Sequence, residues 1–324
     1  MSGETQLACP SCGASLQPGD VFCEQCGARC SDAEPARQRC RSCGAPPDAI
    51  GPDGYCTLCG VREHPPDSRA ELDLVSAAAV TDLGLVHRRN EDAFHLELVG
   101  ERGGAVVVCD GISSASAGDA AARHASAAAG RLLASALADA VPDAREAMLA
   151  AIGAARAAVE QTPWTTRVDR DTPSCTLVSA LWHAGELVIG WIGDSRAYWL
   201  QDGDARQLTV DESWAVEQVA GGLLSEEEAA HDPRLHSITN WVGADAPERP
   251  PQIVSMRPDG AGRLVVCTDG LWNYLSSPAE LVALIGALAP GAAPAAVARS
   301  LTDTALARGG RDNVTVAVVD IDPS

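Results

Sequence analysis

The amino-acid sequence predicts an α+β domain of layered sheets and helices, preceded by small cysteine-rich modules. Three observations lead to this fold class. The chain has 324 residues and is 46% hydrophobic, enough for one large core beside a small unit. Nine of its 12 cysteines fall within the first 60 residues. From about residue 72, strand-like runs are followed by helical stretches and then by more strands and helices, an order typical of α+β domains.

The first 60 residues contain a duplicated Cys-x-x-Cys-Gly pattern. The tight turn of each such knuckle directs two thiolates toward one ion, and the glycine relieves the turn sterically. Two knuckles about ten to twelve residues apart complete a tetrahedral Cys₄ zinc site. The predicted zinc ligands are Cys9, Cys12, Cys23, Cys26, Cys40, Cys43, Cys56 and Cys59.

These cysteines predict two structural Zn²⁺ ions, because segments this short cannot build a core alone. Sequential pairing of the knuckles is the simpler arrangement, but interleaved pairing stays open. A disulfide framework is the alternative, disfavoured because the chain shows no export signal and cytosolic thiols stay reduced. Cys30 is left over as a free thiol.

Residues 61–71 are polar with a Pro-Pro pair and predict a linker, giving ribbons at 1–60 and a larger domain at 72–324. The net charge is −20, and every basic residue other than histidine is arginine. Such acidity argues against binding to nucleic acid or anionic membranes, because like charges repel. Without a secretory signal or a long apolar run, the expected location is the cytoplasm.

In chain order, apolar runs rich in β-branched residues predict the strands, and alanine-rich amphipathic periodicity predicts the helices. Hairpin turns at Ala184-Gly185 and Asp202-Gly203 separate neighbouring strands, and Pro142 lies near a helix start. Strands are predicted at 75–81, 93–99, 105–109, 174–183, 186–193, 196–201, 252–256, 263–268 and 313–320. Helices are predicted at 118–139 and 142–160, from about Trp214, from the acidic start Ser225-Glu226-Glu227-Glu228, and at 277–288 and 292–307.

Four aspartates end apolar runs or lie in Gly-flanked turns: Asp110, Asp194, Asp269 and Asp312. A strand that ends in an acidic residue brings a carboxylate to the sheet edge, and several together suit hard cations such as Mg²⁺ or Mn²⁺. Such a site suits hydrolysis of a phosphate ester by a water that bridges two metals, without a protein nucleophile. By strand alternation, the neighbouring Cys109 and Cys267 should point into the core.

The order of the acidic motifs resembles the metal-dependent type 2C (PPM) serine/threonine protein phosphatases in their bacterial form, over residues 74–320. The resemblance implies a four-layer α-β-β-α sandwich with a two-metal site at one end, and a mobile flap at 211–247. The motifs that carry it are Thr81-Asp82-Leu83-Gly84, Asn90-Glu91-Asp92, Val108-Cys109-Asp110-Gly111, Gly193-Asp194-Ser195-Arg196, Cys267-Thr268-Asp269-Gly270 and Gly310-Arg311-Asp312-Asn313.

Metal-binding roles follow from this resemblance. Asp110 would bridge two Mn²⁺ or Mg²⁺ ions, and the Gly111 carbonyl would bind one of them. Asp269 and Asp312 would complete the second ion. A third, weaker site would use Asp194 together with Asp269.

The same resemblance implies supporting roles. Glu91 and Asp92 would hold metal-bound waters, and Asn313 would brace the Asp312 loop.

The sequence departs from the family at the phosphate-binding position. The family's arginine is His87 here, with Arg88 beside it, and a histidine cannot make a bidentate contact with phosphate. Ile112-Ser113-Ser114-Ala115 replaces the usual Met-Gly-Gly-His, and Asn273 replaces an aspartate. An active enzyme with altered phosphate handling is expected.

The leading hypothesis is therefore a phosphatase acting on phosphoserine and phosphothreonine in proteins modified by a kinase. The zinc ribbons would localise it or bind a protein partner. The alternatives are a catalytically weak pseudo-phosphatase that serves as a phosphoprotein-binding scaffold, and a phosphatase for small phosphoesters.

Overall fold

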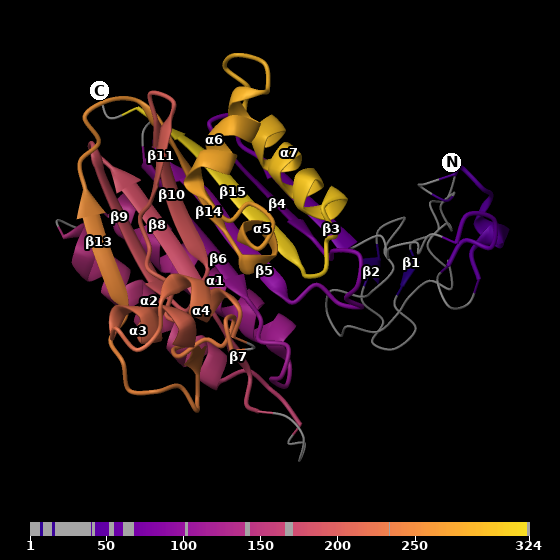
Figure 1. The fold of residues 1–324 in the computed structure, drawn as a ribbon, viewed down its shortest axis with the longest axis horizontal. Helices are drawn as coiled ribbons and strands as arrows, with labels where there is room; N and C mark the ends of the chain where they lie inside the picture. The colour runs from indigo at the N-terminus through magenta and orange to yellow at the C-terminus, as the bar shows by residue number, and fades with distance from the viewer. Residues whose placement is uncertain are drawn as a thin grey trace. The chain divides into compact units, whose positions relative to one another are not determined.

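The structure is a computed structural model of the chain (Figure 1). It describes residues 7–8, 15–16, 40, 43–51, 55–60, 68–100, 103–139, 143–165, 171–232 and 234–322. The chain divides into two compact units, residues 1–65 and 66–324. The predicted zinc ligands Cys9, Cys12, Cys23 and Cys26 lie outside the described residues.

Two antiparallel sheets form the centre of the larger unit (Figure 1). The six-stranded sheet has, in spatial order, β11 (Asp204–Gln207), β10 (Arg196–Gln201), β14 (Gly262–Cys267), β15 (Val314–Ile321), β4 (Ala77–Asp82) and β3 (Arg69–Asp73). The five-stranded sheet has β13 (Gln252–Met256), β9 (Glu186–Ile192), β8 (Leu177–His183), β6 (Gly103–Asp110) and β5 (Asp92–Val99).

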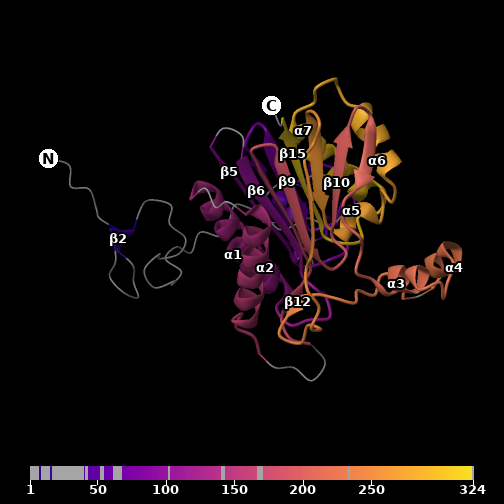
Figure 2. The same ribbon diagram turned by 90° about the vertical axis from the view of Figure 1, so that its left-hand side faces the viewer.

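Helices cover the outer face of each sheet (Figures 1 and 2). The five-stranded sheet is covered by α1 (Gly118–Ala138) and α2 (Ala144–Glu160). The six-stranded sheet is covered by α5 (Asp269–Trp272), α6 (Pro278–Gly286) and α7 (Pro294–Ala307). One apolar core lies between the two sheets, and one lies under each helical layer. The predicted four-layer α-β-β-α sandwich is confirmed.

The flap predicted at 211–247 contains two short helices, α3 (Trp214–Ala220) and α4 (Glu226–Ala230). The acidic helix start is confirmed: Ser225 and Glu228 form a capping box, in which each side chain accepts from the other's backbone N–H. The flap ends at β12 (Val242–Gly243), which pairs with β7 (Ser174–Cys175).

Several elements differ from the sequence prediction, among them β11 and β12, which were not predicted as strands. Strand β3 begins at Arg69, inside the predicted linker. It was not predicted because its polar residues show no strand alternation and because it pairs with a neighbour along one edge only. The strand predicted at 174–183 is divided at Thr176, whose backbone N–H donates to the carbonyl of Asp110 at 2.8 Å. The short helix α5 was not predicted, because four residues carry too little periodicity.

The smaller unit has little regular structure among its described residues. Strand β1 (Leu7–Ala8) pairs with β2 (Ser15–Leu16), and a 3₁₀ turn spans Pro47–Ala49. Its described core consists of Cys40, Ala45 and Cys56, with Ala49 and Ile50 packed against them. Such a core is too small to hold the unit together by apolar burial alone.

Among the helices that the structure describes in both units, none combines the length and apolar character needed to cross a bilayer.

Candidate metal centre and active site

The predicted site lies where strands of both sheets end, at one edge of the space between them. Asp92 at the start of β5 is directly opposite Asp110 at the end of β6. Val106 and Val108 of β6 face the inter-sheet core, whereas Val107 and Cys109 face α1 and α2. By this alternation Asp110 belongs to the inter-sheet face, and Cys109 and Cys267 are fully buried, as predicted.

The structure brings the predicted carboxylates together. Asp269 is the first residue of α5, and Asp312 precedes β15. Burial raises the pKa of Asp110 well above its ordinary value, and the negative charges of Asp92, Asp269, Asp312 and Asp194 raise it further. The five aspartates are thus close enough to interact, although they come from segments far apart in the chain.

Burial also raises the pKa of Asp92, Asp269 and Asp194. It raises the pKa of Asp92 to about 8 and that of Asp269 to about 6, in each case helped by the charge of a neighbouring aspartate. The pKa of Asp194 is raised well above its ordinary value too, mainly by burial and then by the negative charge of Asp269. Buried like charges at such close quarters cannot all ionise without a cation.

Two buried carboxylate oxygens in this cluster have no hydrogen-bond partner among the described residues, Asp92 Oδ1 and Asp269 Oδ1. The other oxygen of each is held by protein: Asp92 Oδ2 accepts from the Thr268 hydroxyl at 2.8 Å, and Asp269 Oδ2 accepts from Asn273 at 3.2 Å. Buried polar atoms are normally paired. The donor set is therefore oriented by the protein, with oxygen atoms left over for hard cations.

Asn313 holds two loops of the site together, and its side chain is only 3% exposed. Its Oδ1 accepts from the backbone N–H of Glu91 at 2.7 Å, and its Nδ2 donates to the carbonyls of Leu83 and Arg89. The predicted bracing role thus has a physical basis, although the bonds reach the 83–91 loop.

Glycines allow this close packing at two positions. Gly84 has φ of +74°, and a Cβ there would overlap the carbonyl of Asp312. A Cβ on Gly270 would likewise overlap the carbonyl of Asn313. Both glycines therefore let backbone segments that carry ligands approach each other directly.

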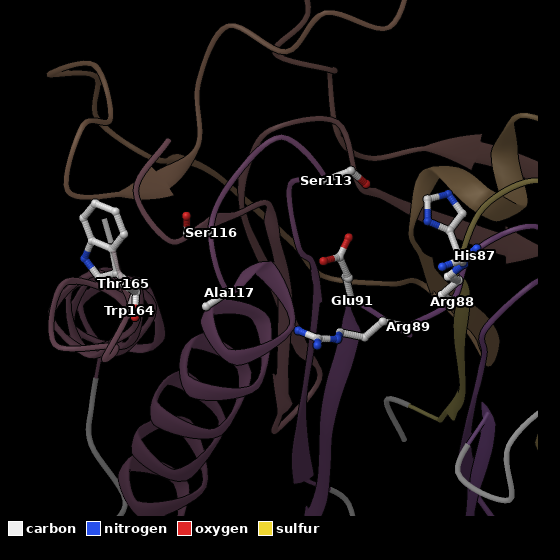
Figure 3. A pocket seen from close by; sticks show the side chains of 9 residues that line it. All are labelled: His87, Arg88, Arg89, Glu91, Ser113, Ser116, Ala117, Trp164 and Thr165. Atoms are coloured by element: carbon white, nitrogen blue, oxygen red, sulfur yellow. The ribbon is translucent and has the colours of Figure 1, made fainter. Parts of the chain in front are cut away.

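A polar pocket of about 490 Å³ opens beside the carboxylates. Figure 3 shows the Glu91 carboxylate directed toward Ser113 inside it. Burial raises the pKa of Glu91, and the hydrogen bond from Ser113 opposes that shift. His87, Arg88 and Trp164 also line the pocket.

His87 contacts a carboxylate as well as lining this pocket: its Nε2 lies 3.2 Å from Asp312 Oδ1. Arg88 has no side-chain hydrogen bond or ion pair within the described part of the chain, so its guanidinium is available. The histidine that replaces the family's arginine is thus held partly by the candidate metal ligand Asp312.

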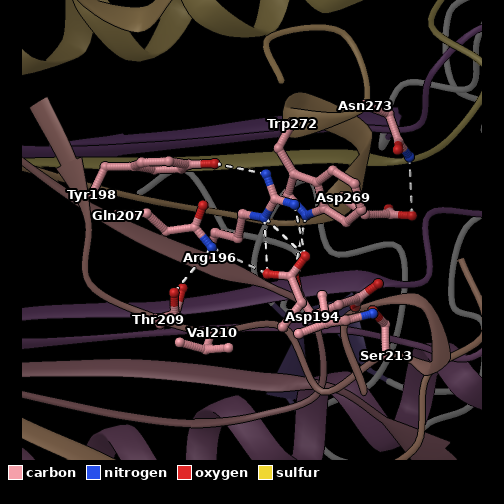
Figure 4. A network of polar contacts seen from close by, with 12 residues as sticks. Asp194, Arg196, Tyr198, Gln207, Thr209, Val210, Ser213, Asp269, Trp272 and Asn273 are labelled. Carbon is pink, nitrogen blue, oxygen red and sulfur yellow. Dashed lines mark hydrogen bonds and ion pairs between the residues drawn. The ribbon is translucent and has the colours of Figure 1, made fainter. Parts of the chain in front are cut away.

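A network around Arg196 supports the Asp194 loop (Figure 4). Arg196 donates to both oxygens of Asp211 and stacks 3.9 Å above the ring of Trp272. Trp272 Nε1 in turn donates to the Asp194 carbonyl at 2.9 Å. Asp194 is therefore positioned by a hydrogen bond from Trp272, whose ring is packed against Arg196.

The flap is anchored at its base by Glu212. Its carboxylate accepts from the backbone N–H of Gly193 at 2.9 Å and from Asn240 at 3.0 Å. The chain entering the flap is thereby fixed next to Asp194, whereas α4 beyond it is mostly exposed.

Sequence reasoning missed several supporting residues. Thr268, which holds Asp92, was marked only by its place before Asp269. Thr176 and Ser195 share a 2.8 Å hydrogen bond beneath Asp110. Thr176 was not identified, and Ser195 was named only as a member of the Gly193-Asp194-Ser195-Arg196 motif, without this role. The only sequence signal for Thr176 is that it is a small polar residue in an otherwise apolar stretch, between β7 and β8.

The smaller unit has a second ligand cluster. The thiols of Cys40, Cys43, Cys56 and Cys59 all lie within 4.8 Å of one another. Sγ separations are 3.6 Å for Cys40–Cys59 and 3.7 Å for Cys43–Cys56. Tetrahedral zinc with Zn–S bonds of about 2.3 Å needs sulfurs about 3.8 Å apart. The four thiols fit that ion, and they pair these two knuckles with each other.

Backbone hydrogen bonds favour the thiolate form of Cys56, whereas the pKa of Cys43 is raised, in part by its contacts with the Cys59 and Cys56 thiols. The backbone N–H groups of Cys59 and Leu58 lower the pKa of Cys56 to about 7. A thiolate is the form that binds zinc.

Comparison with known proteins supports both parts of the chain. A family model for protein phosphatase 2C matches residues 86–305, and one for a zinc-ribbon domain matches residues 9–29. The chain is 32% identical over 254 residues to the serine/threonine protein phosphatase PstP of Mycobacterium tuberculosis. That alignment covers 75% of this chain and 44% of PstP, so the chain spans less than half the length of that relative.

Solved structures resemble the larger unit. The PPM Ser-Thr phosphatase MsPP from Mycobacterium smegmatis, in complex with cacodylate, is 30% identical with a TM-score of 0.59. The match covers 76% of this chain and 98% of that structure. The catalytic domain of PstP in complex with two manganese ions is 28% identical with a TM-score of 0.57, over 78% of this chain and all of that domain.

The family match at residues 86–305 covers more than half of the chain and includes the carboxylates of the candidate site up to Asp269. The fold, the acidic motifs and these similarities agree: the chain belongs to the protein phosphatase 2C family.

Proposed function

We propose that the larger unit is a metal-dependent phosphatase that hydrolyses phosphoserine and phosphothreonine in proteins. The observation that carries this proposal is the pair of buried, unpartnered carboxylate oxygens on Asp92 and Asp269, beside Asp110. The other oxygen of each carboxylate is held by a protein group, and these two oxygens have no donor among the described residues. The manganese ions in the PstP catalytic domain support the choice of cation.

Asp110, Asp269 and Asp312 would hold two Mn²⁺ or Mg²⁺ ions with the carbonyl of Gly111, and Asp194 with Asp269 would hold a weaker third. Bound cations of this kind lower the pKa of water and neutralise charge on phosphoryl oxygens. Glu91 and Asp92 would orient the water ligands: Asp92 Oδ1 is buried without a partner among the described residues, and the Glu91 carboxylate faces the adjoining pocket. Hydrogen bonds from Thr268 to the Asp92 carboxylate and between Asn313 and the Glu91 amide hold these two residues in place and limit their reorganisation.

His87 and Arg88 would bind the phosphoryl group of the substrate. Both line the polar pocket beside Glu91, and the Arg88 guanidinium has no hydrogen bond or ion pair with any of the described residues. His87 also contacts Asp312 through its Nε2. We therefore expect it to contribute a single hydrogen bond to the phosphoryl group and not a bidentate contact.

The test is phosphate release from a phosphothreonine peptide by the metal-stripped full chain, with and without added Mn²⁺. Release should require Mn²⁺ and should be lost in Asp110→Asn. The matched control is Asp202→Asn, which makes the same change in an exposed turn at the β10–β11 hairpin, where asparagine tolerates the φ of +53°. The control should keep wild-type activity.

A different result would move the protein to another class. A folded protein that binds Mn²⁺ and phosphopeptide without releasing phosphate would be a scaffold, as the altered His87 position allows. Turnover of p-nitrophenyl phosphate without turnover of any phosphopeptide would indicate a phosphatase for small phosphoesters.

We further propose that the smaller unit binds two structural Zn²⁺ ions, one at Cys40, Cys43, Cys56 and Cys59 and one at the preceding knuckles. Its ribbons would localise the phosphatase or bind a protein partner in the cytoplasm. The four clustered thiols support the second of these sites. Metal analysis of the purified chain should give two zinc ions per chain.

A further inference from the structure

A second pocket, lined in part by Asp312, is not used by the proposed mechanism. It has a volume of about 680 Å³ and lies between α5, the flap and the loop that leads to Asp312. His236 of the flap, Trp272, Tyr274, Arg308 and Arg311 contribute to its walls. Asp312 itself lines the pocket, which therefore adjoins the candidate metal centre.

The lining of this pocket is basic. It contains three arginines and one histidine, and Asp312 is its single acidic residue. The whole chain has a net charge of −20, so a basic pocket beside the candidate active site contrasts with the acidic character of the chain. If Asp312 binds a cation, its charge is neutralised and the pocket becomes more positive still.

The three arginines differ in whether they form ion pairs with acidic residues of the protein. Arg196 is paired with Asp211, and Arg308 lies 3.2 Å from Glu280. Arg311 is exposed, and its side chain has neither hydrogen bond nor ion pair within the described part of the chain. An unpaired arginine in a concave, basic site is suited to bind a carboxylate or a phosphate.

The position of Arg311 is fixed even though its side chain is uncommitted. Its backbone N–H donates to the Tyr274 hydroxyl at 2.9 Å, and Arg308 donates to the Tyr274 carbonyl. Gly310, on its other side, accepts from the N–H of Leu85 at 2.6 Å. The guanidinium therefore extends from a braced backbone next to Asp312.

We propose that this pocket binds a second anionic group of the substrate peptide, a carboxylate or another phosphate, with Arg311 as its main partner. The inference rests on the proposed phosphatase function and names its substrate class: acidic or multiply phosphorylated segments. Because Arg311 adjoins Asp312, the second anion lies within about one to three residues of the phosphorylated one.

The experiment compares kcat/KM of the Mn²⁺-loaded full chain for phosphothreonine peptides of equal length. Their flanking residues are alanine, glutamate, lysine or, in a fourth peptide, a non-hydrolysable phosphonate. Glutamate and phosphonate peptides should exceed the alanine peptide by about tenfold, and high salt should reduce the difference. The relative rates of the two anionic peptides show which anion the pocket prefers.

Three variants locate the effect. Arg311→Ala should reduce the acidic-to-alanine ratio to near one, whereas Arg311→Lys should keep most of it. The matched control is Arg131→Ala, because Arg131 is also exposed and without a partner among the described residues but lies far along α1. It should leave the ratio unchanged.

Two results would overturn the inference while leaving the phosphatase in place. One is equal kcat/KM for all peptides in the wild type. The other is an Arg311→Ala variant that loses activity equally on all of them, which would mean that Arg311 supports the Asp312 loop. Wild-type protein that turns over neither peptides nor p-nitrophenyl phosphate would overturn both proposals.

Discussion

The two ligand clusters of this chain are assembled in opposite ways. The thiols of the smaller unit come from 20 consecutive positions, Cys40–Cys59, around a described core of three residues. The carboxylates of the larger unit come from segments as distant as Asp92 and Asp312, and they sit on a sandwich with three extensive cores. We therefore expect the first cluster to need a metal ion to define its fold, and the second to be positioned by a fold that forms without one.

The largest expected effect on activity comes from a substitution that removes one carboxylate from the second cluster. Asp269→Asn should lower phosphate release by at least about a hundredfold, because a candidate ligand is lost. The fold should remain, since the change also relieves repulsion among buried acids. Phosphate release by the variant tests the first expectation, and its thermal unfolding tests the second. Normal activity would show that the site is assigned wrongly.

The corresponding change in the thiol cluster should affect structure without affecting chemistry. Cys56→Ser should lower the zinc content by one ion per chain and make residues 40–60 sensitive to protease, because no sufficient core remains there. Turnover of p-nitrophenyl phosphate should stay at the wild-type level. Cys267→Ser is the comparison, since that buried thiol is not in the cluster and zinc content should not change.

A pH series sharpens the contrast further. The pKa values of Asp92 and Asp269 are raised to about 8 and 6, above the usual value of about 3.9 in an unfolded chain. The folded, metal-free protein therefore holds protons that the unfolded chain has released. Its free energy of unfolding should decrease as pH rises from about 4 to 8.

Added Mn²⁺ replaces those protons, so the difference in Tm with and without Mn²⁺ should widen over the same pH range. Asp92→Asn should flatten the profile of the metal-free protein. A metal-free Tm that rises steadily from pH 5 to pH 8 would contradict the assigned direction of these shifts.

The smallest effect concerns phosphate capture. His87→Arg should lower KM for p-nitrophenyl phosphate by about tenfold with little change in kcat, because arginine makes a bidentate contact. His183→Arg, on an exposed hairpin, should change neither constant. An unchanged KM in His87→Arg would mean that contact with Asp312 keeps the side chain from the phosphate.

Much of the sandwich could be predicted because its strands are continuous apolar runs and its helices are long and periodic. The acidic residues could be predicted because they end those runs. What could not be predicted is the set of contacts that only the folded chain creates, such as Thr268 to Asp92 and His87 to Asp312. Strand β3 was missed for a related reason, since its edge position is defined by its neighbour β4 and not by its own sequence.

The side chain of Asn313 has a consequence for how the site opens. It accepts from the Glu91 amide and donates to two carbonyls of the 83–91 loop, so the two loops share one buried connection. The Glu91 amide hydrogen can exchange with solvent only when that connection breaks. Its exchange rate therefore reports how often the Asp312 loop and the Glu91 loop separate, and the two should open as a single cooperative unit.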